Sequence, residues 1–279
     1  MPVPLRLEDA YALRDNGRYS ASYEAFLEIE AKTDNVFVKA NARLGAALAA
    51  VGLGNNDLSR SQLATIREFL THPVSTSSAE EAYELQRLKI AVEIQEATIE
   101  AAEGKAQAAL SRYNSLIDLY KTDLVREDFR DIRDTLYGEK AFLLADLLSF
   151  EGALPILEKL EGSQSRNSSV LFYLGYCYME IKRFGVAREK LEKAIALGLI
   201  GNFSFRAHWA LGISLCKLGD YASAKTEFER SRSTASPADL ANGRVLQWLE
   251  YCCEQLGLKE EAIEYARLIG GTGGGNKTF

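Results

Sequence analysis

The stretch spanning residues 169–197 reads SVLFYLGYCYMEIKRFGVAREKLEKAIAL. It consists of two segments rich in helix-forming residues, separated by residues 182–185. In the first segment Leu171, Leu174 and Tyr178 recur every three or four residues, the spacing of one face of an α-helix. The stretch therefore predicts a hairpin of two short amphipathic helices.

The same pattern recurs along the second half of the chain. The Leu-Gly pair at 174–175 returns at 211–212, which is 37 residues later. The small residue of the second helix recurs with a similar period, at Ala153, Ala187, Ala224 and Ala262. Four hairpins in one register are therefore expected between residues 135 and 268.

The first half contains weaker copies of the pattern. Residues 17–26 have the composition of a turn and a second helix, and residues 40–48 match the first helix of the next hairpin, including its Leu-Gly pair. Residues 79–103 and 105–120 predict a hairpin with longer arms. The charged segment 121–135 is expected to connect this hairpin to the regular units.

The hairpin at 169–197 resembles the tetratricopeptide repeat, whose loose signature is a large residue, Leu-Gly, an aromatic residue and a small residue in the second helix. The matching residues are Leu171, Leu174, Gly175, Tyr178, Ala187, Leu191 and Ala194. In the next unit Trp209 lies one place after the expected large residue, which is His208, and the family's terminal Pro is missing from all four units. The resemblance implies an all-α fold, a right-handed superhelical solenoid of about seven antiparallel helical hairpins.

Such an array is expected to form one domain, because a single hairpin cannot bury its apolar face and stacked hairpins share a core. The predicted solenoid spans residues 1–269. It has degenerate repeats over 5–78, the longer irregular hairpin and connector over 79–134, and regular repeats over 135–269. Residues 270–279 predict a flexible Gly-rich tail.

Small residues in the signature have a packing role. Gly175 and Gly212, with Ala187 and Ala224, remove side-chain bulk where two helices cross. We therefore expect short distances between helices at these four positions.

Charge, apolar runs and cysteine spacing argue against nucleic-acid-binding, secreted, membrane-spanning and zinc-binding classes of protein. A formal charge of −6 argues against binding nucleic acid, which needs clustered Lys and Arg. The N-terminal residues lack the apolar run of a signal peptide, and no uncharged apolar run reaches the roughly 18 residues that cross a bilayer. The four cysteines, at 177, 216, 252 and 253, lack the spacing of a zinc site. We predict a cytoplasmic protein without membrane insertion, cofactor or metal.

Candidate binding residues follow from the resemblance, because in this family the first helix of each hairpin lines a concave groove that holds peptides. Counted from the Leu-Gly pairs, the groove positions are Phe172, Tyr176 and Met179 in one unit, Trp209, Ile213 and Cys216 in the next, and Gln247, Tyr251 and Glu254 in the last. The Lys and Asn with which some members hold a terminal carboxylate are missing there. The resemblance thus implies an apolar or amphipathic peptide or protein segment as the partner. The alternative is that these side chains pack on one another.

Arg206 and Arg244 occupy equivalent positions in consecutive units, just before the groove positions of each unit. Either they form a ladder for an acidic partner segment, or they are surface charges paired with neighbouring Asp or Glu.

The predicted function is a non-catalytic scaffold or adaptor that binds a protein segment in this groove. The alternative is a structural subunit of a larger assembly, including a homo-oligomer, that binds through its convex face or helical ends. Catalysis has little support, because the chain has only His72 and His208 and no distinctive carboxylate pair. An enzyme site between 59 and 135 is the third hypothesis, and it requires a cluster of buried ionisable groups with strongly shifted pKa values.

Overall fold

The computed structural model describes residues 6–71, 78–199, 201–236, 240 and 243–271 of the 279 in the chain. Within these residues every regular element is a helix, which confirms the predicted all-α class. The predicted tail lies outside the described residues from position 272 onward, and so does His72. No helix in the described part of the chain is long and apolar enough to cross a membrane.

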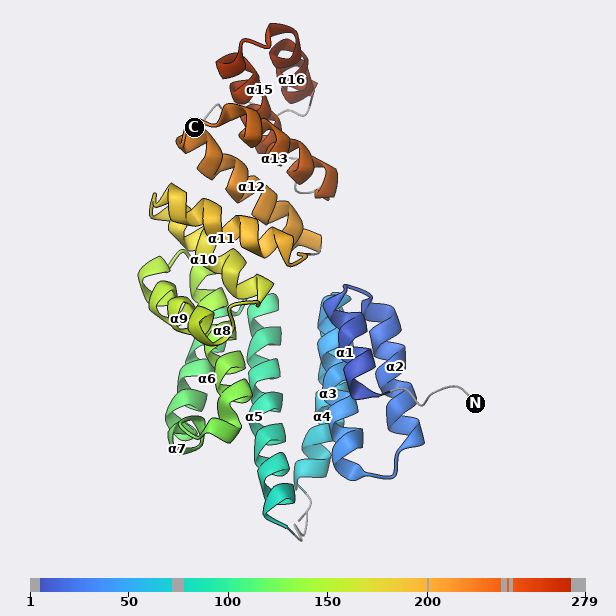
Figure 1. Ribbon diagram of the computed structural model, residues 1–279. Helices are drawn as coiled ribbons and strands as arrows, with labels where there is room; N and C mark the ends of the chain where they lie inside the picture. The colour runs from blue at the N-terminus through green and yellow to red at the C-terminus, as the bar shows by residue number, and fades with distance from the viewer. Residues whose placement is uncertain (1–5, 72–77, 200, 237–239, 241–242, 272–279) are drawn as a thin grey trace. The chain divides into compact units, whose positions relative to one another are not determined.

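The chain packs as two compact units, Met1–Leu143 and Leu144–Phe279 (Figure 1). The first contains α1 (Leu7–Asp15), α2 (Tyr19–Lys32), α3 (Val36–Gly52), α4 (Asn56–Thr71), α5 (Ala79–Ala102), α6 (Ala106–Leu119), α7 (Lys121–Leu124), the 3₁₀ helix η1 (Glu127–Phe129) and most of α8 (Arg130–Asp146). The second contains α9 (Phe150–Ser163), α10 (Ser168–Glu180), α11 (Phe184–Ala196), α12 (Gly201–Lys217), α13 (Tyr221–Thr234), α15 (Arg244–Leu256) and α16 (Lys259–Gly271).

Seven turns of one kind join the two helices of each hairpin in the described residues. In each turn one residue has left-handed backbone dihedrals; these residues are Gly17, Gly54, Gly104, Leu148, Lys182, Gly219 and Gly257. At Lys182 the N–H donates to the carbonyl of Met179 at 2.9 Å, and the next N–H donates to that of Tyr178 at 2.8 Å. This pair of bonds is the Schellman motif, which ends a helix and reverses the chain. The seven turns confirm the predicted number of hairpins.

Side-chain caps fix where several helices begin. The Asn167 side-chain oxygen accepts hydrogen bonds from the N–H groups of Ser169 and Val170 at 3.0 and 3.1 Å, at the start of α10. Asn35 caps α3 in the same way, and Ser78 caps α5 with one such bond. These caps satisfy N–H groups that have no partner inside the helix.

Small residues allow the two helices of a hairpin to approach closely in the second unit. A Cβ atom on Gly175 would lie 2.5 Å from Leu191 Cγ, and one on Gly212 would lie 2.7 Å from Phe228 Cε1. Ala187 and Ala224 are fully buried. The expected close crossings are therefore confirmed.

The Leu-Gly pair of the first unit packs differently. A Cβ on Gly45 of α3 would overlap the ring of Phe26, which belongs to the preceding helix α2 and not to the hairpin partner α4. The close approach there joins two successive hairpins, and Ala42 and Ala46 of α3 belong to the same buried cluster as Phe26.

The segment between α6 and α8 has more regular structure than the predicted connector. α7 and η1 bury Leu124 and Phe129, which are 4% and 1% exposed. The Phe129 ring packs edge-on against Tyr83 with ring centres 5.0 Å apart. α8 consequently starts at Arg130, several residues before the position where the regular units were expected to begin.

Candidate binding surface

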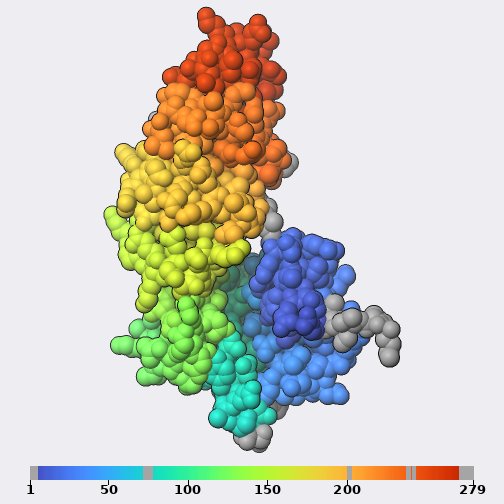
Figure 2. Space-filling model, viewed as in Figure 1, coloured from blue at the N-terminus to red at the C-terminus, as the bar shows by residue number. Residues whose placement is uncertain are grey.

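Three first helices, α10, α12 and α15, follow one another in the second unit, and α12 contacts both of the others. The hairpins of this unit lie against each other in chain order, from yellow to red in Figure 2. Among the predicted groove positions, four large side chains on these helices are partly exposed: Tyr176, Trp209, Ile213 and Tyr251. We call them the first-helix face. Trp209 and Ile213 are one helical turn apart and therefore lie on the same side of α12.

Arg206 of α12 lies over aromatic rings of α10. Its guanidinium carbon is 5.2 Å from the ring centre of Phe172, 5.7 Å from that of Tyr173 and 5.3 Å from that of Tyr176. Asp146 accepts a hydrogen bond from Arg206 Nη2 at 2.8 Å and another from the Tyr173 hydroxyl at 2.9 Å. Three aromatic faces and one carboxylate thus hold this cation in place.

The protonation states in this cluster are fixed near neutral pH. Burial acts to lower the pKa of Arg206, but the hydrogen bond and charge of Asp146 outweigh it, so the pKa is raised. Burial raises the pKa values of Tyr173 and Tyr176 above their ordinary range. Arg206 therefore stays charged and both hydroxyls stay neutral. Because Asp146 neutralises Arg206, this arginine is a poor anchor for an acidic partner.

The other end of α12 makes a similar contact with α15. Lys217 Nζ lies 5.5 Å from the ring centre of Trp248. Trp248 also stacks on Phe228 at 5.6 Å and meets Tyr251 edge-on at 5.9 Å. Each end of α12 thus places a cation over an aromatic ring of a neighbouring first helix.

The structure separates the predicted groove residues into two groups. Phe172, Met179 and Gln247 are buried, with exposures of 0, 4 and 7%, and they belong to the packing between helices. Tyr176, Trp209, Ile213 and Tyr251 reach the surface, Arg206 is ion-paired, and Arg244 is exposed at the first residue of α15.

Three residues of this region were not among the predicted positions. Lys217, Trp248 and Asp146 contribute to the contacts that hold α12. Trp248 directly follows the predicted position Gln247, so the buried amide and the partly exposed indole are adjacent in the sequence. No sequence signal links Asp146 to Arg206, because 60 residues separate them.

His208 has a polar partner beside this surface. Its Nδ1 lies 2.7 Å from Glu227 Oε2, and Glu227 also accepts a hydrogen bond from Arg230 at 2.6 Å. Both partners of the His208 contact are nearly buried, with side-chain exposures of 12% and 10%. We therefore assign His208 to the packing of α12 on α13.

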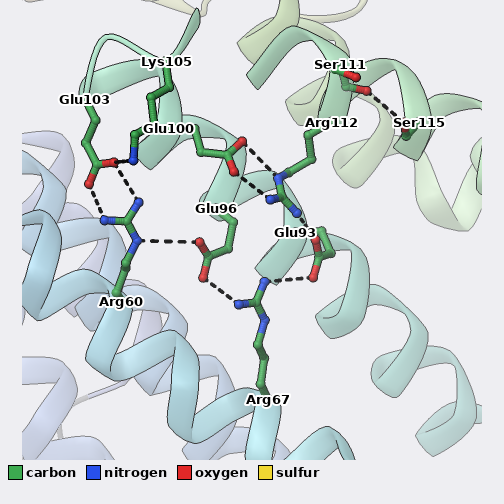
Figure 3. Close-up of polar contacts among 10 residues, drawn as sticks. All are labelled: Arg60, Arg67, Glu93, Glu96, Glu100, Glu103, Lys105, Ser111, Arg112 and Ser115. Carbon is green, nitrogen blue, oxygen red and sulfur yellow. Dashed lines mark hydrogen bonds and ion pairs between the residues drawn. The ribbon is translucent and has the colours of Figure 1, made fainter. Parts of the chain in front are cut away.

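The region between 59 and 135 contains a network of charged side chains from α4, α5 and α6 (Figure 3). Arg67 pairs with Glu93 at 3.0 Å and with Glu96 at 2.9 Å. Arg112 reaches Glu93 at 2.8 Å and Glu100 at 2.7 Å. Arg60 approaches Glu96 at 4.0 Å and pairs with Glu103. Cations and carboxylates therefore alternate along the line where α4 and α6 meet α5.

The pKa shifts in this network favour the charged forms. Hydrogen bonds from Arg60 and Lys105 lower the pKa of Glu103 to about 2. The hydrogen bond from Arg112 lowers the pKa of Glu100, and the same bond raises the pKa of Arg112. Because these shifts move pKa values away from neutrality, the groups are poor proton donors or acceptors near pH 7. The network acts as a structural link between helices.

Glu139 of α8 has a pKa shift in the opposite direction. Burial raises its pKa, and Thr98 Oγ1 donates a hydrogen bond to it at 3.4 Å. The Tyr113 hydroxyl lies 3.1 Å from the same threonine oxygen. The described residues contain no group of three or more metal-ligating side chains here or elsewhere.

Known protein structures show the same architecture. A Rap protein complexed with Competence and Sporulation Factor superposes with a TM-score of 0.59 and 13% identity, over 95% of this chain and 75% of that chain. A MamA mutant superposes with a TM-score of 0.51 and 17% identity, over 65% of this chain and 96% of that chain. No family model and no curated protein sequence matches. The repeated hairpin with its left-handed turn, together with these likenesses, gives the chain the fold of the tetratricopeptide repeat superfamily.

Proposed function

We propose that this protein is a non-catalytic scaffold that binds a peptide or protein segment on the first-helix face. The observation that supports this most directly is the exposure of Tyr176, Trp209, Ile213 and Tyr251 on consecutive first helices. Large aromatic side chains on rigid helices provide contact area with little loss of conformational entropy, as at protein interfaces.

The chemistry of this face favours an apolar or amphipathic partner. Its centre is an indole and an aliphatic side chain one turn apart on α12. The nearest cation at one end, Arg206, is neutralised by Asp146. An amphipathic helix that lays its apolar side on this face suits the arrangement better than an acidic segment does. The Rap structure, a complex with Competence and Sporulation Factor, supports the proposal because its fold accommodates a bound factor.

The test uses the full chain and the double variant Trp209→Ala/Tyr176→Ala. Partners captured from the native lysate are identified by mass spectrometry, and their affinities for both proteins are then measured by calorimetry. We expect the double variant to lose at least about tenfold in affinity, as truncation of aromatic anchors does at other interfaces. The control is Leu119→Ala, a residue that is 71% exposed at the end of α6 in the first unit. Equal affinity of a folded double variant would exclude this face as the binding site.

A second candidate function is that of a subunit in an assembly. α16, the last helix that the structure describes, exposes Ile263 and Leu268 by 54% and 39%. Exposed large apolar side chains that gather on one helix are typical of protein–protein interaction sites. Light scattering after chromatography tests this candidate: a stable oligomer that Ile263→Glu converts to a monomer supports it, and a monomer at all concentrations excludes self-assembly.

A further inference from the structure

Two cysteines on neighbouring first helices face each other inside the second unit. Cys216 Sγ of α12 and Cys252 Sγ of α15 are 3.3 Å apart, although 36 residues separate them in the sequence. Cys216 is 6% exposed and Cys252 is fully buried. Both are free thiols.

We propose that Cys216 and Cys252 form a dithiol modification site, which low-molecular-weight disulfides such as oxidised glutathione convert into a disulfide between α12 and α15. A disulfide bond is about 2.05 Å long, so the sulfurs must approach by roughly 1.2 Å. Side-chain rotation can provide most of this approach, because the two helices are already in contact.

The geometry selects Cys252 over its neighbour Cys253. Successive residues of an α-helix point about 100° apart around its axis. Cys252 is directed towards Cys216, and Cys253 is fully buried on another side of α15. Cys177 lies on α10, at the other side of α12 from α15. The pairing of 216 with 252 is therefore specific among the four cysteines.

The reaction is two successive thiol–disulfide exchanges. The thiolate of one cysteine attacks a sulfur of oxidised glutathione, forms a mixed disulfide and releases one glutathione thiolate. The second cysteine thiolate attacks the protein sulfur of that mixed disulfide and releases the second glutathione. The protein loses two electrons and two protons, and one oxidised glutathione becomes two molecules of the reduced thiol. Cys216 is the expected entry point because it is the more exposed of the two.

The surroundings of Cys252, Cys253 and Cys177 keep the thiolate fraction of these three residues low near neutral pH. The hydrogen bond with Cys216, followed by burial, raises the pKa of Cys252. Burial raises the pKa of Cys253 to about 11 and that of Cys177 to about 12. Since the thiolate is the reactive form, we expect exchange to become faster as pH rises towards 9.

The test is disulfide mapping of the full chain. The protein is incubated with oxidised glutathione at pH 8.5, quenched with an alkylating reagent, digested without reduction and analysed by mass spectrometry. We expect a peptide pair joined through 216 and 252, and a fall in free thiols from four to two. The disulfide should raise the melting temperature by about 5 °C or more, because it closes a long loop, and dithiothreitol should reverse the rise.

Variants separate this site from general cysteine oxidation. Cys252→Ala and Cys216→Ala should abolish the disulfide and the rise in melting temperature, whereas Cys253→Ala should keep both. Disulfide mapping of the oxidised protein without substitutions tests the proposal even if a variant does not fold. A link through Cys253 or Cys177, glutathione that remains attached to Cys216, or four free thiols after prolonged oxidation would each overturn the proposal.

Discussion

Gly175 shows how one missing side chain sets the distance between two helices. Alanine at a helical glycine usually stabilises a helix by up to about 1 kcal/mol. Here the new Cβ would lie 2.5 Å from Leu191 Cγ and 3.1 Å from the Leu191 backbone nitrogen. The backbone atom cannot move without shifting α11, so overpacking is expected to outweigh the helix propensity.

We therefore predict that Gly175→Ala lowers the free energy of unfolding by about 1–3 kcal/mol, measured by urea denaturation. The matched control is Gly162→Ala, because a Cβ on this helical glycine meets no atom within 4 Å. That variant should be neutral or more stable. An increase in stability for both variants would contradict the packing role of Gly175.

The burial of Glu139 makes its contribution to folding stability depend on pH. Burial raises its pKa above the unfolded value, so the folded state favours the neutral carboxyl. This group therefore contributes most stability below the unfolded pKa, and the contribution is lost as pH rises through the folded pKa.

We predict that Glu139→Gln raises the melting temperature by a few degrees at pH 7, because glutamine has the shape of the carboxyl group without its charge. The gain should disappear near pH 4, where the native side chain is protonated. Thermal unfolding followed by circular dichroism at both pH values checks this. Glu192→Gln, on the exposed side of α11, is the control and should bring no gain at either pH.

At the scale of elements, the hairpin turn is the unit that repeats. Lys182 adopts a φ of 65° in the turn between α10 and α11, where Gly219 and Gly257 adopt 84° and 74° in the next two hairpins. The left-handed conformation costs a non-glycine residue roughly 1–2 kcal/mol. The hairpins α8–α9 and α10–α11, with Leu148 and Lys182, therefore have turns under strain.

The predicted effect of Lys182→Gly is a gain of about 1 kcal/mol in unfolding free energy, since glycine adopts this backbone at little cost. Lys182→Ala retains the Cβ and removes only the charge, so it should change stability by less than about 0.5 kcal/mol. Denaturant unfolding of both variants distinguishes backbone strain from charge. Equal effects of the two substitutions would rule out strain as the cause.

The Arg206–Asp146 ion pair fixes helix α12 to the end of α8, next to the α10 rings that Arg206 also contacts. Their side chains are 25% and 41% exposed, so solvent weakens the ion pair, while the rings of Phe172 and Tyr176 add to it. A double-mutant cycle of Arg206→Ala and Asp146→Ala should give a coupling energy of about 0.5–1 kcal/mol.

The reference for this cycle is the exposed pair Arg188–Glu192 on α11, with side-chain exposures of 46% and 47%. Its coupling should be at most about 0.5 kcal/mol. If both cycles gave the same energy, the aromatic enclosure of Arg206 would contribute nothing to the ion pair.

At the scale of the whole molecule, different kinds of contact stabilise the interior of each unit. The second unit relies on repeated apolar packing, in which Gly212 and Phe228 copy the contact of Gly175 and Leu191. The first unit adds the charged network around Glu96 to its apolar core. The longer α5 makes this possible, because it places Glu93, Glu96 and Glu100 at spacings of three and four residues along one side of the helix, with Glu103 following as its C-cap.

The candidate surface was predictable only in part. The Leu-Gly count identified α10, α12 and α15 as first helices and placed Trp209 and Ile213 correctly on one helix side. It did not distinguish the buried Phe172 from the partly exposed Tyr176, although both lie on one side of α10. Exposure depends on the neighbouring helix, since Arg206 of α12 lies over both rings, whereas Phe203 of α12 also packs edge-on against Phe172 with ring centres 5.5 Å apart.

The sequence by itself determined the helical hairpins, their register and their approximate number, because the apolar period, the small residues and the turn glycines are local properties of the chain. Tertiary structure alone decided which side chains of the first helices reach the surface, which cations are neutralised, and which two cysteines meet. Asp146 and Arg206 are 60 residues apart, and Cys216 and Cys252 are 36 apart. Contacts of this kind depend on how hairpins stack, which follows from the shapes of many side chains together and not from any local pattern.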